Sequence, residues 1–248
     1  MIHYHGSPLG GHADDAVRFF AGRHAFVSVE YPQQVGVVAS VCQSFALDNG
    51  AFSVWRRGGT LNLDAVYGFY GDWLKHPACD WAIIPDVIQG SEDDNDSLLK
   101  AWPFSRTQGV PVWHYHESLE RLDRLVSEWP RVALGSSGEW PTPGTSSWWS
   151  RTNEAMIVAC DEAGYPKCKL HGLRMLSPKL VKRLPLASAD STNAVRNARD
   201  GTMRWESGVK PLRQSTRAIV IAESIESSLT ACRWKAKRIV RQLSLVNQ

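Results

Sequence analysis

Asp48, Asp86 and Asp190 each stand at the end of a short segment of small or apolar residues in this 248-residue chain. Each one alone is best explained as a turn or helix cap, because a short carboxylate accepts hydrogen bonds from nearby backbone N–H groups. Together they suit chemistry at a glycosidic carbon. One carboxylate can attack the anomeric carbon while another moves the proton of the departing or arriving group. The third could accept hydrogen bonds from the N–H groups of a base.

Glycines and one aromatic residue lie near these aspartates in the sequence. Gly50, Gly135, Gly138 and Gly172 permit the backbone to approach a flat heterocycle closely. Phe52 offers a face on which such a ring can stack. Ordinary core packing is the alternative role for Phe52.

The pattern of apolar segments indicates which elements would hold these residues. Eight short apolar or β-branched segments are separated mostly by helix-like stretches, a pattern typical of an α/β protein with a compact (β/α)8 TIM-type barrel. The predicted strands are residues 2–5, 25–29, 44–47, 81–84, 111–114, 131–134, 168–171 and 185–188. The carboxyl ends of barrel strands share one face. The residues expected at that face are His5, Asp48, Asp86, His114, Gly135, His171 and Asp190.

The intervening segments supply the predicted helices. Apolar residues at helical spacing predict helices over residues 61–75 and 119–126, whereas 33–41 gives the weakest helix. Residues 135–150 are predicted to form a long loop. The chain is expected to close with a helix over 218–245. Its inward side would hold Ile221, Ile225, Leu229, Cys232 and Ile239, and its outer side Arg233, Lys237, Arg238 and Arg241.

Length and composition predict a single domain over residues 1–248, with the barrel at about 1–190 and a polar, basic segment and C-terminal helix at about 191–248. The chain shows neither a signal-peptide pattern nor an apolar run near the roughly 20 residues of a membrane helix. We therefore expect a soluble, cytoplasmic protein that contacts no membrane. Five cysteines without a CxxC pair argue against a disulfide framework and a cysteine zinc cluster.

The charge is distributed unevenly. Residues 167–248 contain 17 of the 28 Lys and Arg residues but only 5 of the 25 Asp and Glu residues. A basic third on an otherwise acidic protein favours a polyanionic partner. The alternative is a solvated helix face balanced by acidic neighbours elsewhere on the fold.

Five sequence blocks carry the residues singled out above. They are FALDNGAFS (residues 45–53), IPDVIQG (84–90), VALGSSGE (132–139), KLHGLRML (169–176) and ASADSTN (187–193). In order and spacing these blocks resemble the conserved motifs of the guanine transglycosylases. That family consists of (β/α)8 enzymes that exchange guanine for a 7-deazaguanine in nucleic acid. The resemblance covers about residues 45–193, most of the predicted barrel.

The resemblance implies a role for each matching residue. Asp190 corresponds to the family's nucleophilic aspartate and Asp48 to its general acid/base. Asp86 corresponds to the aspartate that reads the base edge, and Phe52 to the stacking aromatic. The rest of the predicted substrate site is Gly135, Ser136, His171, Gly172 and His114. His171 stands where tRNA-acting members commonly have an apolar residue, so base stacking is expected to differ in detail.

Departures from the tRNA enzymes favour DNA as the substrate. Those enzymes carry a Cys-rich zinc site after the barrel, whereas the residues after Asp190 include one cysteine, Cys232, and no histidine. No zinc cofactor of that type is therefore expected, and no appended RNA-binding domain is recognised. The compact chain resembles the DpdA-type DNA-guanine transglycosylases of phages and bacterial DNA-modification islands. This implies DNA and a 7-deazaguanine base such as preQ0 as partners, and the host cytoplasm as the location if a phage encodes the protein.

A DNA substrate gives the basic third and the tryptophans of residues 135–150 predicted roles. The target base must leave the duplex stack, so Trp140, Trp148 and Trp149 are candidates for stacking on the opened strand, with packing of the loop as the alternative. The residues predicted to hold the flanking phosphates are Arg196, Arg199, Arg204, Lys210 and Arg213.

Three alternatives remain open at the level of sequence. His3 and His5 with His114, His171 and Asp190 partly match a metal-dependent amidohydrolase-like barrel hydrolase, although the sixth strand lacks the usual histidine ligand. A tRNA-acting guanine transglycosylase is the second alternative. A non-catalytic nucleic-acid-binding barrel is the third, but it leaves three aspartates at strand ends unexplained.

Overall fold

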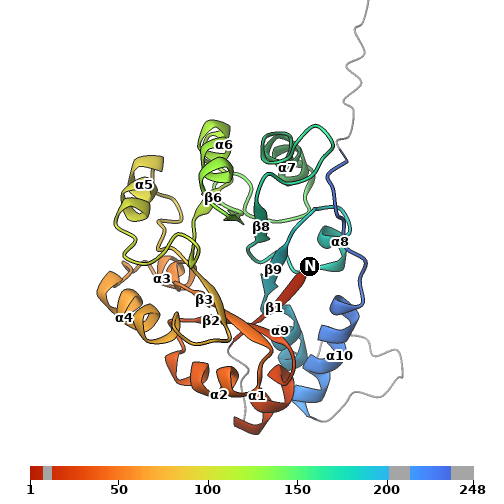
Figure 1. The fold of residues 1–248 in the computed structure, drawn as a ribbon. Coiled ribbons are helices and arrows are strands. Elements are labelled where there is room, and N and C mark those ends of the chain that lie inside the picture. The colour runs from red at the N-terminus through yellow and green to blue at the C-terminus, as the bar shows by residue number, and fades with distance from the viewer. Residues whose placement is uncertain (8–12, 201–212, 236–248) are drawn as a thin grey trace, which may run out of the picture.

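The computed structural model describes residues 1–7, 13–200 and 213–235, and it is an α/β fold in which helices surround a parallel sheet (Figure 1). The strands are β1 (Ile2–Gly6), β2 (His24–Ser28), β3 (Ser44–Asp48), β4 (Cys79–Ile83), β5 (Gly109–Val110), β6 (Val112–His114), β7 (Arg131–Gly135), β8 (Lys169–Gly172) and β9 (Ser188–Ser191). The helices are α1 (Ala13–Phe20), a 3-10 turn at Pro32–Gln34, α2 (Val35–Val41), α3 (Ala51–Arg56), α4 (Leu63–Trp73), α5 (Glu92–Lys100), α6 (Leu119–Glu128), α7 (Ser146–Ala159), α8 (Pro178–Val181), α9 (Asn193–Asp200) and α10 (Gln214–Glu226).

The sheet is parallel throughout and nearly closes into a barrel. Its strand order is β5-β4-β3-β2-β1-β9-β8-β7-β6, so the two edge strands are consecutive in the chain. Only Pro111 separates β5 from β6: β5 pairs with β4, whereas β6 pairs with β7. Proline has no backbone N–H to donate, which explains the interruption at this point. The carbonyl oxygen of Pro111 still accepts a hydrogen bond from Ala133 N at 2.9 Å, which links the residue between β5 and β6 to β7.

The predicted strands and helices largely match this architecture. The clearest strand error concerns residues 185–188, because β9 begins only at Ser188 and contains Asp190. The helix predicted over 61–75 is α4, where Asn62 accepts a hydrogen bond from Ala65 N and caps the helix. The helix predicted over 119–126 is α6, which Ser118 caps in the same way.

Two apolar layers fix which side of the sheet each strand residue faces. A smaller cluster fills the interior, with Tyr4, Phe26, Ala46 and Trp81 among its members. The larger cluster lies between the strands and the surrounding helices, as in alternating strands buried on both sides. Residues of one strand therefore point alternately inward and outward. None of the helices in the described residues has the length and apolar character needed to cross a bilayer.

Two predictions about the later part of the chain are wrong. Within the described residues the helix predicted over 218–245 is α10, which ends at Glu226, because Ser227 caps it and Ala231 N then bonds to Val181 O, which leads the chain away. Ile221 and Ile225 are buried as predicted, but Leu229 is 82% exposed and Cys232 is exposed. Arg233 is exposed, and the other predicted positions, Ile239, Lys237, Arg238 and Arg241, lie outside the described residues.

The predicted loop over 135–150 is shorter than expected. Thr145 accepts a hydrogen bond from Trp148 N, so α7 starts at Ser146. Trp148 is 0% exposed, stacks on Tyr115 with ring centroids 5.4 Å apart and donates from Nε1 to Ser136 Oγ at 2.9 Å. Trp148 therefore packs the helix onto the fold, and no face of it is open to a nucleic-acid base. Trp140 and Trp149 are partly buried and pack against the larger apolar cluster.

Candidate active site

The segment Leu47-Asp48-Asn49-Gly50 turns the chain out of β3 and into α3. Gly50 has φ +74° and directly precedes α3, and a side chain there would meet Glu30 Cγ at 2.9 Å and Val29 Cγ1 at 3.1 Å. Only glycine fits this left-handed and crowded position at low cost. The turn leaves Asp48 at the carboxyl end of β3, where the Ser28 hydroxyl and the Gly50 backbone N–H stabilise the charged form of its carboxylate.

Asp48 lies deep among other acidic groups, although part of its surface remains accessible to solvent. Burial raises the pKa of Asp48 from 3.8 to about 7, with a further increase from the negative charges of Asp190 and Asp86. The hydrogen bonds from Ser28 and Gly50 act in the opposite direction. Asp48 therefore exchanges its proton near neutral pH, as a general acid/base requires. The mutual influence also shows that the three predicted aspartates lie together.

Asp86 is held by a side chain that the sequence analysis did not assign, Asn49. Asn49 Nδ2 donates to Asp86 Oδ1 at 2.6 Å and to the Ile84 carbonyl at 3.0 Å, while its Oδ1 accepts from Ala51 N at 2.8 Å. His114 Nε2 lies 2.8 Å from Asp86 Oδ2. Because each carboxylate oxygen can accept more than one hydrogen bond, Asp86 is oriented by two partners and still has acceptor capacity for a ligand.

Asp190 is the last inward-facing residue of β9 and is only 5% exposed. Its Oδ1 accepts a hydrogen bond from Arg174 N at 2.9 Å. His171 Nε2 lies 3.3 Å from the same oxygen, at ion-pair distance but without hydrogen-bond alignment. Burial lowers the pKa of His171, which outweighs the opposing effect of Asp190 and keeps the imidazole neutral at neutral pH.

His171 forms part of the layer beneath the carboxylates. It is 0% exposed, and its ring centroid lies 4.8 Å from that of Trp81 and 5.6 Å from that of Phe26. Its Nδ1 is 2.9 Å from Ser188 Oγ. The structure therefore places this predicted base-contacting residue below Asp190, where it supports the carboxylate.

Arg174 is the second residue that the sequence analysis did not assign. It has φ 58° and is the one non-glycine residue with positive φ in the described ranges. Its NH2 donates to the Ser136 carbonyl at 3.1 Å, and its Cζ lies 4.0 Å from the centroid of the Phe52 ring. An arginine carries no sequence signal for left-handed backbone, so only the structure reveals its position between Asp190 and Phe52.

The remaining predicted substrate residues divide into two groups. Gly135 ends β7 beside His114 and Ser136 follows it, and a side chain at 135 would meet His114 Nδ1 at 3.0 Å. Gly172 faces the other side of its strand, where an added Cβ would lie 2.8 Å from Leu186 Cδ1 and 2.9 Å from Met175 Cβ. Packing explains the glycine at 172 without any approach of a ligand.

The histidines considered for a metal site do not converge. His5 points outward, where its Nε2 lies 2.8 Å from Glu226 Oε1 and its ring packs on Phe19. His114 and His171 point toward the carboxylates instead. Over residues 1–7, 13–200 and 213–235, no three His, Cys, Asp or Glu side chains form a group suited to a metal ion. The five cysteines are free.

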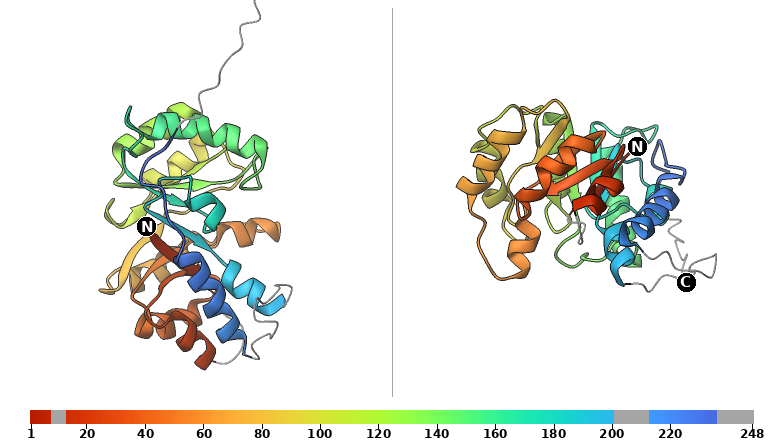
Figure 2. Two further views of the ribbon diagram at one scale, coloured as in Figure 1. Left: turned by 90° about the vertical axis from the view of Figure 1, so that its right-hand side faces the viewer. Right: turned by 90° about the horizontal axis from the view of Figure 1, so that it is seen from below.

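The structure describes only part of the predicted phosphate-binding set. Arg196 on α9 and Arg213 before α10 are exposed, and the two helices pack against each other (Figures 1 and 2). The side chain of Arg199 and all of Arg204 and Lys210 lie outside the described residues.

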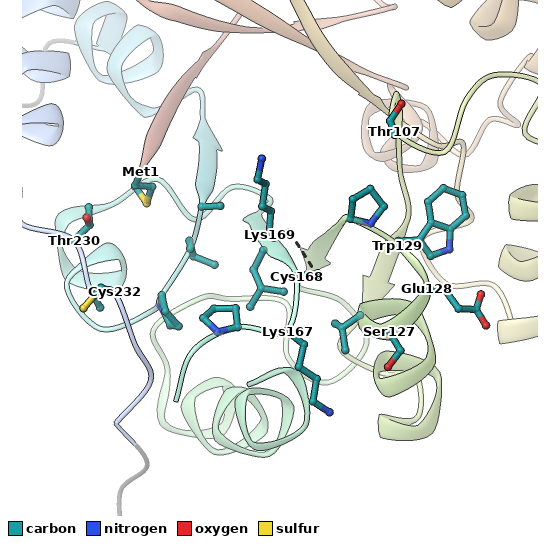
Figure 3. A pocket seen from close by; sticks show the side chains of 18 residues that line it. Met1, Thr107, Ser127, Glu128, Trp129, Lys167, Cys168, Lys169, Thr230 and Cys232 are labelled. Carbon is teal, nitrogen blue, oxygen red and sulfur yellow. Dashed lines mark hydrogen bonds between the residues drawn. The ribbon is translucent and has the colours of Figure 1, made fainter. Parts of the chain in front are cut away.

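A cavity of about 950 Å³ lies away from the three aspartates (Figure 3). Its walls include Met1 before β1, Pro130 before β7 and Cys168 and Lys169 at the start of β8. These positions are at the amino ends of the strands, opposite to the ends that carry Asp48 and Asp190. In parallel α/β folds chemistry is assembled at the carboxyl ends, so we assign the candidate active site to the carboxylate cluster.

Comparison with known proteins does not assign a family. No protein-family model matches the chain, and a search of curated proteins finds no significant match. The residues at the carboxyl ends of the strands therefore carry the evidence about function.

Proposed function

We propose that the protein is a DNA-guanine transglycosylase, a pentosyltransferase built on a (β/α)8 barrel in which β5 and β6 together count as one strand. The observation that carries this proposal is the cluster of Asp48, Asp86 and Asp190, in which Asp48 has its pKa raised to about 7. Base exchange needs an ionised nucleophile beside a group that both gives and takes a proton near neutral pH. Two carboxylates in different environments can divide these roles.

In the first half of the proposed reaction, a carboxylate oxygen of Asp190 attacks C1′ of a deoxyguanosine. The C1′–N9 bond breaks, its electron pair leaves with guanine, and protonated Asp48 supplies the proton that neutralises the base. In the second half, a 7-deazaguanine such as preQ0 loses its N9 proton to Asp48 and attacks C1′. The bond between C1′ and Asp190 breaks, which restores the carboxylate. The exchange consumes no nucleotide and involves no redox step.

Asp86 is the proposed reader of the base. Asn49 and His114 hold its two oxygens at 2.6 Å and 2.8 Å, so its carboxylate presents a fixed edge toward the cluster. A guanine offers two N–H groups side by side, N1–H and the exocyclic amine, which match two carboxylate oxygens. Adenine has no donor at N1, so this arrangement favours guanine-type bases.

DNA is the proposed polymer because of chain composition. The basic residues of 167–248 suit a polyanion, and the exposed Arg196 and Arg213 are available to phosphates. The sequence after Asp190 has one cysteine, Cys232, and no histidine, which is fewer than the Cys-rich zinc site of the tRNA enzymes contains. The alternative polymer is tRNA, and the experiment below compares it directly with DNA.

The test is incorporation of labelled guanine or preQ0 into duplex DNA and into tRNA. We expect incorporation into DNA, and a covalent DNA adduct that can be trapped with the wild-type protein but not with Asp190→Ala. Asp86→Ala should still form an adduct while discriminating poorly between guanine and other bases. Absence of incorporation into both polymers, or normal exchange by Asp190→Ala, would refute the proposal.

A further inference from the structure

Arg174 joins the proposed nucleophile to the proposed stacking ring. Its backbone N–H donates to Asp190 Oδ1, while its guanidinium covers the Phe52 ring with Cζ 4.0 Å from the centroid. One residue therefore contacts both parts of the site. Its left-handed backbone makes this possible, because the amide and the side chain are directed to different neighbours.

The guanidinium occupies the place that a base stacked on this face of Phe52 would need. A base inserted between two planar groups requires two van der Waals contacts, or a separation of about 7–8 Å. The 4.0 Å separation leaves no room for one. A base that approaches this face of Phe52 must therefore either displace Arg174 or stack on the guanidinium itself.

Two observations favour stacking on the guanidinium. Arg174 NH2 donates to the carbonyl of Ser136 at 3.1 Å, which anchors the planar group in addition to its contact with Phe52. The Arg174 side chain is nevertheless exposed, so the anchored group retains solvent-accessible surface beside Asp190. A guanidinium is planar and weakly hydrated, and it stacks on aromatic faces.

We propose that the guanidinium of Arg174, backed by Phe52, is the surface on which the substrate base stacks. This rests on the proposed function. The positive charge of Arg174 then lies against the purine ring, where negative charge develops as the C1′–N9 bond breaks. A fixed cation at that point stabilises the departing base. Phe52 acts through Arg174 rather than by touching the base.

The test compares Arg174→Gly and Arg174→Lys with the wild-type protein in calorimetric titrations with free guanine. Glycine accepts φ 58° without strain and keeps the amide that bonds to Asp190, so Arg174→Gly removes only the side chain. We expect guanine to bind at least about tenfold more weakly to this variant. Arg174→Lys keeps the charge but lacks the planar group, and it should also bind weakly. Thermal unfolding checks that both variants are folded.

The sign of the change separates the two arrangements. If Arg174 only covers Phe52 until a base displaces it, Arg174→Gly will bind guanine more tightly than the wild type, and Phe52→Leu will bind it more weakly. Tighter or unchanged binding by Arg174→Gly in a protein whose wild-type form exchanges bases would overturn this inference alone. A wild-type protein that neither exchanges bases nor binds guanine would overturn the proposed function together with it.

Discussion

Replacing Asp48 with asparagine should stabilise the protein at neutral and alkaline pH while abolishing exchange. The pKa of Asp48 is raised from 3.8 to about 7 in the folded chain, chiefly by burial and then by Asp190. Between these two values the unfolded chain has released the proton and the folded chain retains it. Stability therefore falls as pH rises from about 4 to about 7 and stays lowered above it. Asparagine carries no charge and removes this penalty.

The magnitude follows from the size of the pKa change. A difference of about 3 in pKa corresponds to at most about 4 kcal/mol, at about 1.4 kcal/mol for each tenfold change. Because Asp48 keeps some contact with solvent, we expect about 1–3 kcal/mol of stabilisation at pH 8. At pH 3 Asp48 is protonated in both states, so the two proteins should differ little.

Urea unfolding of Asp48→Asn and the wild type between pH 3 and pH 8 measures this difference. The exposed Asp72, on α4, provides a matched control. Asp72→Asn should change the free energy of unfolding by no more than about 0.5 kcal/mol at any pH. An Asp48→Asn protein that is less stable than the wild type at pH 8, or whose difference does not depend on pH, would refute the reasoning. Asp48 would then be a turn cap.

The other predictions concern α10, the basic surface and Trp148. Glu226→Gln should cost about 1 kcal/mol at pH 7 in urea unfolding, because Glu226 accepts from His5 Nε2, which is the main cause of its lowered pKa. This contribution is present above the ordinary glutamate pKa and is lost as pH falls through the lowered value, so equal losses at pH 3 and pH 7 would contradict it. Arg196→Gln should make the slope of log DNA affinity against log salt shallower by about 0.9, whereas Lys100→Gln on α5, across the molecule from α9, should leave it unchanged (Figure 1). Trp148→Ala should cost about 3–5 kcal/mol of stability in denaturant unfolding. A small loss there, with impaired exchange on duplex DNA alone, would return Trp148 to a role in strand opening.

Elements with regularly spaced apolar residues could be predicted from the sequence. Elements whose inward-facing residues are polar could not. β3 and β7 are apolar runs that end in a turn, and both were found. In β9 the inward positions are Ser188 and Asp190, so a strand that serves the site has no apolar alternation. The apolar residues just before it carry the pattern that predicts a strand.

The cluster of aspartates was predictable because all three lie at or just beyond the carboxyl ends of strands, which a barrel brings to one face. The supporting residues were not. Asn49 acts through contacts with Asp86 and Ile84, more than 30 residues away in the chain. The role of Arg174 depends on a backbone angle that arginine rarely adopts. Spacing within a sequence carries neither kind of information.

The competing metal-hydrolase interpretation depends on which face of β1 points inward, and strand register decides this. Paired residues on neighbouring strands face the same side of a sheet, and Tyr4 pairs with Asp190 across β1 and β9. His3 and His5 are therefore on the opposite face, and His5 is bonded to Glu226 of α10. Bringing the two histidines to the carboxylates would require a shift of β1 by one residue. That shift would turn Tyr4 outward and break its interior contacts with Trp81 and His171, whose ring centroids lie 5.3 Å and 6.0 Å from that of Tyr4. The same register that turns the histidine pair outward leaves Asp190 on the inward face of the sheet with Asp48, as the proposed base exchange requires.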